Sequence, residues 1–208
     1  MKIGIIGKGN MGSVFAKNLT KKHEIFIGSR DVKSAAQTVK SFGKNVKVGS
    51  IKEAVEFGEV IILAVGWHAV DEVLKSAPNL ENKILVDITN PFNKDMNGLA
   101  VDTKKTSAAE EIQKISKATV VKAFNTVFSH VIESGGKFNG QKASVLFCGD
   151  DAIAKKKVAK IIEDLDFEAI DIGPLSAARI LEELGYINIA LGYALKMGTN
   201  QAFKLLKR

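Results

Sequence analysis

The sequence predicts an α/β protein in which a doubly wound, mainly parallel sheet carries a small C-terminal α/β-helical appendage. Short apolar runs alternate with amphipathic segments, which is the rhythm of a sheet with helices on both faces. Residues 60–65 are continuously apolar, as expected of a strand covered on both sides. A glycine-rich turn joins the first apolar run directly to an amphipathic segment. We therefore divide the chain into a main sheet domain, residues 1–143, and an appendage packed on it, residues 144–208.

The first third of the chain alternates strand and helix. Residues 2–6 predict a buried strand, and the helix after it places Met11, Val14, Phe15 and Leu19 on one face. A second strand at residues 24–28 leads into a helix that begins after Asp31. A short third strand, residues 46–48, precedes a helix over 51–57. Ser50 and Glu53 have the spacing of a capping box at the start of that helix.

The same alternation continues through the middle of the chain. After the strand at 60–65 we expect a helix over 69–76 and a fifth strand over 84–88. Residues 94–106 are polar with little periodicity, so they predict a surface excursion. The expected order then continues with a helix at 107–116, a strand at 119–124 and a helix at 127–134.

The appendage begins where the chain changes style. We expect a strand at 144–148, a lysine-rich helix at 151–165 and a strand at 168–172. Residues 175–206 then predict a long helical stretch, because they contain no proline and their apolar residues recur every three or four positions. Gly185, Gly192 and Gly198 can interrupt it. This stretch has two open interpretations: it packs on its own sheet, or it forms a dimer interface.

Composition narrows the classes of function. No apolar run reaches the roughly 18 residues of a membrane span, and no secretory signal is recognisable, so we expect a cytoplasmic protein with no membrane partner. The one cysteine, Cys148, excludes an internal disulfide, and we expect it to be a buried small apolar residue. The three histidines lie far apart without metal-ligand spacing, so we expect no metal site.

The net charge of +7 raises the question of nucleic acid binding. The lysines are scattered over the predicted helices, and the chain has neither a basic tail nor an alternation of basic and aromatic residues. We therefore expect no nucleic acid partner. Solvated helix faces, together with attraction for an anionic cofactor, account better for the charge.

The turn after the first strand has the spacing G-x-G-x-x-G, set by Gly7, Gly9 and Gly12. Between a strand and a helix this spacing is the fingerprint of a dinucleotide site, because the free amides at the helix N-terminus bind a pyrophosphate. The alternative is a glycine-rich turn without a ligand. The candidate cofactor-binding residues here are Gly7, Lys8, Gly9, Asn10, Met11 and Gly12.

The end of the second strand indicates which dinucleotide binds. NAD sites usually place Asp or Glu there for the ribose hydroxyl, but this chain has Ser29 and Arg30. A hydroxyl and a guanidinium suit a 2′-phosphate, which favours NADP over NAD. Asp31 can bind ribose, although capping of the next helix is the better interpretation. Lys33 and Lys8 can add positive charge, and for Lys8 an exposed lysine without a role is an equal alternative.

The ends of strands four, five and six should meet at the same edge of the sheet as the fingerprint. We expect Ala64, Val65 and Gly66 to line the cofactor path, and Thr89 and Asn90 to offer hydrogen bonds to the nicotinamide region. Asp87, inside its strand, is interpreted as structural. The candidates for a substrate pocket are Trp67, His68, Asn90, Phe124 and Asn125, and for Trp67 and His68 packing at the head of a helix is an equal alternative. No catalytic residue is assigned.

Five segments, residues 7–12, 28–30, 87–91, 122–126 and 173–175, together resemble one family. Over nearly its whole length the chain is similar to the NADP oxidoreductases that depend on a deazaflavin, coenzyme F420, and to small dinucleotide-binding relatives of them. The glycine motif alone is shared with pyrroline-carboxylate reductases. Two departures concern the second substrate: Lys8 stands where the family often has Thr, and the proline often found near Gly66 is missing.

The resemblance implies a Rossmann domain with a small appendage and NADP lying along the sheet edge. It also implies direct hydride transfer between nicotinamide and a deazaflavin or flavin, and it places the 2′-phosphate at Ser29 and Arg30. The partner is then a small-molecule hydride donor or acceptor, and a homodimer is possible. A different class, a regulatory protein that senses NADP without turnover, stays open as the alternative.

Overall fold

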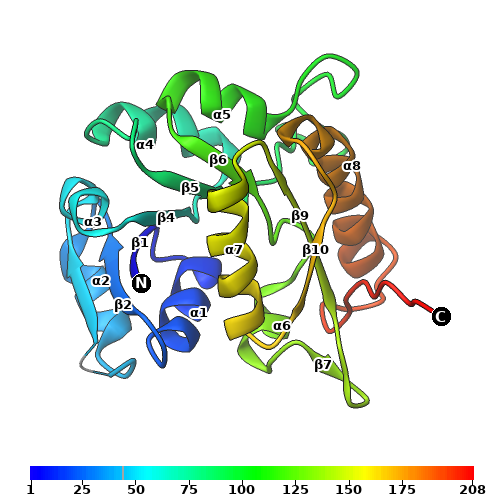
Figure 1. The fold of residues 1–208 in the computed structure, drawn as a ribbon, viewed down its shortest axis with the longest axis horizontal. Coiled ribbons are helices and arrows are strands. Elements are labelled where there is room, and N and C mark those ends of the chain that lie inside the picture. Colours follow the sequence, from blue (N-terminus) through cyan, green and yellow to red (C-terminus); the bar gives the residue numbers. More distant parts are fainter. Residues whose placement is uncertain (44) are drawn as a thin grey trace.

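The computed structural model describes residues 1–43 and 45–208, and its centre is an eight-stranded sheet in the order β10-β9-β6-β5-β4-β1-β2-β3 (Figure 1). All neighbouring strands are parallel except β6 and β9. The expected doubly wound, mainly parallel α/β fold is thus confirmed. The strands are β1 (Lys2–Ile6), β2 (Glu24–Gly28), β3 (Val46–Gly49), β4 (Val60–Leu63), β5 (Ile84–Asp87), β6 (Thr119–Lys122), β9 (Ser144–Gly149) and β10 (Glu168–Asp171).

Two apolar cores lie on the two faces of the sheet, because successive strand residues point to opposite sides. Ile5 and Ile62 belong to one core, while their neighbours Ile6 and Leu63 belong to the other. The first core contains side chains of α1 (Asn10–Leu19), α2 (Val32–Val39), α6 (Ser129–Glu133) and α7 (Ala152–Asp164). The second contains side chains of α3 (Ile51–Phe57), α4 (Val70–Ser76), α5 (Ala108–Ser116) and α8 (Ala178–Ile189).

The strand order reverses between β1 and β4, and this point determines where a ligand can bind. β1 pairs with β2 on one side and with β4 on the other, in parallel register. The carboxyl ends of β1, β2, β4, β5 and β6 therefore lie at one edge of the sheet. A crevice outside that edge, at the reversal, is the usual ligand site of an open α/β sheet.

Residues 144–208 extend the same sheet. β9 pairs antiparallel with β6, with Lys122 opposite Cys148, and β10 lies parallel to β9 at the edge. A small hairpin, β7 (Lys137–Phe138) and β8 (Gln141–Lys142), precedes this change of direction. The change in sequence style near residue 143 therefore coincides with a reversal of strand direction within a continuous sheet.

The C-terminal helix is shorter than the sequence pattern suggests. α8 ends at Ile189 and is followed by one π-helical segment, Ala190–Ala194. Lys196 and Gly198 then adopt positive φ of 56° and 86°, which a right-handed helix does not allow. The last residues instead run beside the start of β9, where the Ser144 amide donates a hydrogen bond to the Phe203 carbonyl.

None of the helices in the described part of the chain is both long and apolar enough to span a membrane.

Candidate functional site

The glycine turn after β1 is shaped by close packing at Gly7 and Gly12 and by open space at Gly9. Gly7 has φ of +113°, and a Cβ there would lie 2.2 Å from the Ala64 carbonyl oxygen. A Cβ on Gly12 would lie 2.0 Å from the Gly7 carbonyl oxygen. A Cβ on Gly9 would meet nothing within 4 Å. Gly7 and Gly12 are thus required by the protein's own packing, whereas Gly9 leaves room for a ligand at the backbone.

The N-terminus of α1 opens onto this turn with unpaired amides. Gly9 is its N-cap residue and supplies no side-chain cap, and the first turn has no acidic residue. Within residues 1–43 and 45–208, the amides of Asn10, Met11 and Gly12 have no hydrogen-bond partner. Free amides and the positive end of the helix dipole favour an anion at this position.

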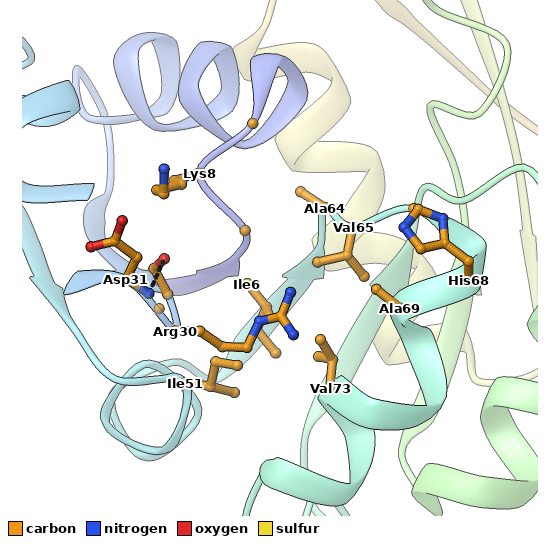
Figure 2. Close-up of a pocket in the computed structure, with 15 residues that line it drawn as sticks. Ile6, Lys8, Arg30, Asp31, Ile51, Ala64, Val65, His68, Ala69 and Val73 are labelled. Carbon is orange, nitrogen blue, oxygen red and sulfur yellow. Dashed lines mark hydrogen bonds between the residues drawn. The ribbon is translucent and has the colours of Figure 1, made fainter. Parts of the chain in front are cut away.

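A cavity of about 370 Å³ runs from this turn between the ends of β1, β2 and β4 (Figure 2). Its walls include most of the cofactor-binding residues predicted from the sequence: Gly7, Lys8, Gly9, Ser29, Arg30, Ala64, Val65 and Gly66. The pattern gave no reason to single out Ile51, Ala69 and Val73, yet they form an apolar part of the wall. The repeated apolar residues of α3 and α4 look like ordinary core positions, and only the three-dimensional arrangement shows that these three border a cavity.

Both cations at this cavity already have partners in the protein. The Lys8 ammonium donates a hydrogen bond to Ser34 Oγ at 2.8 Å. Arg30 Nη1 forms an ion pair of 2.6 Å with Glu72 Oε1. The Asp31 carboxylate accepts a hydrogen bond from the Ser34 amide and so caps α2, as the second interpretation of Asp31 expected.

Ser29 and Lys33, two other predicted cofactor-binding residues, differ in their position relative to the cavity. The Ser29 hydroxyl oxygen accepts a hydrogen bond from the Asp31 amide and lies at the cavity. Lys33 lies in the first turn of α2, outside the walls of this cavity. Asn10, Met11 and Gly12 are also outside those walls and form the first turn of α1.

A second cavity of about 410 Å³ lies next to the first. Gly66 and His68 border both cavities, and the His68 ring lies against Gly66, where a Cβ would be 2.7 Å from Cε1. Trp67 and Asn90, two of the candidates for a substrate pocket, line the second cavity. The remaining walls are Phe92, Asn93, Lys94 and Met96. Lys94 and Met96 belong to the polar stretch 94–106, whose lack of periodicity gave no signal that it borders a pocket, and Phe92 and Asn93 directly precede it.

Phe124 and Asn125 have positions other than the expected ones. Phe124 is fully buried, and its ring packs edge-on at 5.0 Å from Phe15 and 6.5 Å from Phe167, measured between centroids. The backbone at Phe124 has φ of +62°, which turns its side chain into the core. Phe124 therefore lines neither cavity.

Asn125 holds the side chain of Asn90 in place through two hydrogen bonds. Its side-chain amide donates hydrogen bonds to the Leu181 carbonyl oxygen at 2.7 Å and to Asn90 Oδ1 at 3.0 Å. Asn90 Nδ2 in turn donates to the Asn125 carbonyl oxygen at 2.8 Å. Thr89 is also buried, and its hydroxyl has no partner among the described residues. Asn125 thus orients Asn90, which borders the cavity.

A buried ionic network lies at the carboxyl ends of β5 and β6. The ammonium of Lys122 contacts Asp87 Oδ2 at 2.8 Å, the Thr89 carbonyl oxygen at 2.7 Å and Glu182 Oε1 at 3.1 Å, and all three charged side chains are fully buried. Glu182 also accepts hydrogen bonds from the amides of Ala108 and Ala109 at the start of α5. The network fixes the backbone at Thr89, next to Asn90. Sequence reasoning expected a structural Asp87 but did not identify Glu182, which lies far away in the chain.

The pKa values in this network follow from burial and charge. Burial lowers the pKa of Lys122, but attraction to Asp87 and Glu182 outweighs it, so that pKa is raised and the ammonium stays charged. Burial raises the pKa of Glu182, and Lys122 partly offsets that effect. Burial also raises the pKa of Cys148 to about 12. Cys148 is therefore a buried thiol at neutral pH, consistent with the expectation of a packing role.

Three comparisons place the chain among known proteins. Residues 2–91 match the family model for NADP oxidoreductase, coenzyme F420-dependent. The chain is 31% identical to the F420-dependent NADP reductase of Methanocaldococcus jannaschii, and the similarity covers 94% of each chain. It is 30% identical to the metalloreductase STEAP3 of Rattus norvegicus over 88% of its own length, but it spans only 36% of that relative.

A solved structure from Arthrobacter sp. FB24, described as that of a candidate F420-dependent NADP reductase, has the same fold. Its TM-score is 0.88 at 31% identity, and the two chains cover each other completely. The relative from Methanocaldococcus jannaschii and this structure both extend over the sheet, the cavities and the C-terminal strands. The chain therefore belongs to the family of coenzyme F420-dependent NADP oxidoreductases, and it is an oxidoreductase of the NADP-dependent class.

Proposed function

We propose that the chain holds NADP(H) along the first cavity and exchanges hydride between its nicotinamide and a deazaflavin, or a flavin as fallback acceptor, in the second cavity. The observation that carries this proposal is that the two cavities are neighbours, with Gly66 and His68 in the walls of both. A single elongated cofactor can thus reach from the glycine turn to the second cavity. A deazaflavin as the partner of NADP is supported by relatives that are described as F420-dependent NADP reductases.

The residues at the first cavity fit NADP(H) on their own chemistry. Gly9 leaves the backbone open, and the free amides of α1 suit the pyrophosphate. Arg30 and Ser29 lie where a ribose 2′-phosphate would need a cation and a hydroxyl. Lys8 lines the same cavity and can contribute a second cation.

The second cavity fits a flat, anionic hydride acceptor. Trp67, Phe92 and Met96 offer apolar surface for a ring, and Lys94 offers a positive charge at the rim for an acidic tail. Its volume lies within the roughly 300–1,000 Å³ range of small-molecule sites. A sensor without turnover would need no such space beside the nicotinamide end, so the cavity favours the enzyme over the sensor.

The protein's contribution to the reaction would be alignment. The nicotinamide supplies the reactive hydride, so no acid–base pair is needed. Asn90 Nδ2 donates one N–H to the Asn125 carbonyl oxygen and has no second partner among the described residues, so its other N–H can orient a carboxamide. Reacting carbons must approach to roughly 3–3.5 Å, which requires the acceptor ring to stack directly on the nicotinamide.

The cytoplasmic location and the homodimer expected from the sequence also belong to this proposal. The dimer is supported by apolar side chains that α8 and the segment after it leave exposed, namely Ile180, Ile187, Tyr193 and Leu195.

The test measures NADPH oxidation with deazaflavin, with flavin mononucleotide and with ferric chelates, in parallel with NADPH affinity. We expect oxidation by deazaflavin to be fastest. Lys94→Trp should abolish it, because the indole fills the second cavity and the cation is lost, whereas NADPH affinity should stay within about twofold. Lys104→Trp is the matched control, since Lys104 is an exposed lysine of the same loop and borders neither cavity.

Two outcomes would contradict the proposal. Full activity of Lys94→Trp would show that the acceptor does not use the second cavity. Tight NADPH binding by the unaltered protein without oxidation by any of the three acceptors would favour the sensor.

A further inference from the structure

An ion pair closes the outer rim of the first cavity. Arg30, just after β2, reaches across the cavity toward α4, where Figure 2 shows it beside Val73. Its Nη1 lies 2.6 Å from Oε1 of Glu72, the residue before Val73. The side chains are 63% and 65% exposed, so water competes for both partners. The pair therefore links the two walls of the cavity weakly and reversibly.

The carboxylate and a 2′-phosphate would compete for the same guanidinium. Arg30 is the only arginine that lines either cavity in the described part of the chain. A phosphate monoester carries nearly two negative charges at neutral pH, and its oxygens match the paired N–H groups of a guanidinium. Binding it next to Glu72 requires Arg30 to loosen that ion pair and places two anions close together.

We propose that Glu72 is a specificity-determining residue that weakens NADP(H) binding by competing with the 2′-phosphate for Arg30. The proposal rests on the proposed binding of NADP(H) in this cavity. NADH lacks the phosphate and leaves the Arg30–Glu72 pair intact, so Glu72 acts on one cofactor only. In this way Glu72 reduces the preference for NADPH over NADH that Arg30 creates.

The neighbouring residue provides a matched control. Asp71 and Glu72 are the two acidic residues in the first turn of α4, so each is placed to interact favourably with the helix dipole. Asp71 forms no ion pair with Arg30 and borders neither cavity among the described residues. Asp71→Asn removes the same charge from the same turn without freeing Arg30.

The experiment measures the Kd of NADPH and of NADH for the unaltered protein, Glu72→Gln and Asp71→Asn at low and high salt. Glu72→Gln should bind NADPH about two- to fivefold more tightly, the factor that about 0.4–1 kcal/mol for an exposed ion pair produces at 1.4 kcal/mol per decade. NADH affinity should not change. The gain should shrink at 1 M salt, because the competing charges are then screened.

Unchanged or weaker NADPH binding by Glu72→Gln would overturn the inference, and weaker binding would show that Glu72 holds Arg30 ready for the phosphate. An equal gain of NADPH affinity in Asp71→Asn would show that removing any negative charge from this turn is enough, and that freeing Arg30 is not the cause. Arg30→Ala separates this failure from failure of the proposed function. If Arg30→Ala loses no NADPH affinity, the 2′-phosphate does not bind at this rim at all.

Discussion

At the scale of single residues, Arg30 is expected to decide which dinucleotide binds. A hydrogen bond to a charged group contributes about 1.5–3 kcal/mol, so Arg30→Ala should weaken NADPH binding roughly ten- to a hundredfold. NADH binding should change little, because that cofactor has no phosphate at this position. Isothermal calorimetry with both cofactors measures the two effects directly.

Lys33→Ala serves as the control for Arg30→Ala. Lys33 is an exposed cation of the same region and borders neither cavity, so its removal should alter both affinities by less than about twofold. Equal losses of NADPH and NADH affinity in Arg30→Ala would mean that Arg30 supports the shape of the cavity instead of the phosphate.

The residues at the strand ends show how far sequence alone reaches. Residue types and their order identify Ser29, Arg30 and Asn90, because parallel strands bring their carboxyl ends to one edge. The order of residues does not predict the direction in which a side chain points after the strand ends. Phe124 follows β6 by only two residues, and its positive φ turns it into the core. Nothing in the local pattern marks that left-handed backbone, since phenylalanine rarely adopts it.

At the scale of elements, the turn between β1 and α1 separates packing from ligand binding. Gly9 has φ of −68° and ψ of −173°, which alanine adopts without strain, and its Cβ would point into open space. Gly9→Ala should keep the melting temperature within about 2 °C. It should weaken NADPH and NADH alike by about tenfold or more, because the methyl group keeps a phosphate from the amides.

Gly12→Ala, in contrast to Gly9→Ala, should lower the melting temperature. Its Cβ would lie 2.0 Å from the Gly7 carbonyl oxygen, so helix and turn must move apart. Overpacking of this kind costs about 1–3 kcal/mol, which corresponds to a fall of roughly 2–12 °C in melting temperature. Thermal unfolding followed by circular dichroism, together with cofactor titration, checks both variants. A stable Gly12→Ala protein would mean that the close contact relaxes easily.

Element boundaries follow from the sequence where a local signal exists. The Ser50–Glu53 capping box forms as predicted, with both reciprocal hydrogen bonds, and α3 begins at Ile51. The end of α8 at Ile189 has no capping signal of this kind, since the apolar periodicity continues past it, although Gly198, one of the glycines expected to interrupt the stretch, has a positive φ of 86°. The hydrogen bonds of Phe203 and Leu205 to Ser144 at the start of β9 join positions far apart in the chain, so no local pattern predicts them.

At the scale of the whole molecule, one buried ammonium joins the two parts of the chain. Lys122 on β6 links Asp87 on β5 to Glu182 on α8, and Glu182 holds the start of α5. The network thus spans the expected boundary near residue 143. Because it also fixes the Thr89 carbonyl, the position of the C-terminal helix and the geometry at Asn90 are coupled through the same side chain.

Lys122→Met should therefore destabilise the whole protein. The methionine fills similar space but leaves two buried carboxylates without a cation, a change that costs about 3–5 kcal/mol. For a chain of this size the melting temperature should fall by roughly 6–20 °C. Lys114→Met is the control, because Lys114 pairs with Glu111 on an exposed helix face and its loss should stay within about 0.5 kcal/mol.

The sign of the pH dependence gives an independent check on Lys122. Its pKa is raised in the folded protein, so its contribution to the free energy of unfolding is complete below the unfolded value of about 10.4 and disappears only as pH rises through the folded value. The gap in melting temperature between the unaltered protein and Lys122→Met should hence not shrink between pH 7 and pH 9, and it should widen if Glu182, whose pKa burial raises, takes up a proton in the variant. A gap that closes between these values would show that Lys122 loses its proton in the folded protein below its ordinary pKa, and a loss no larger than that of Lys114→Met would show that the carboxylates reach water without Lys122.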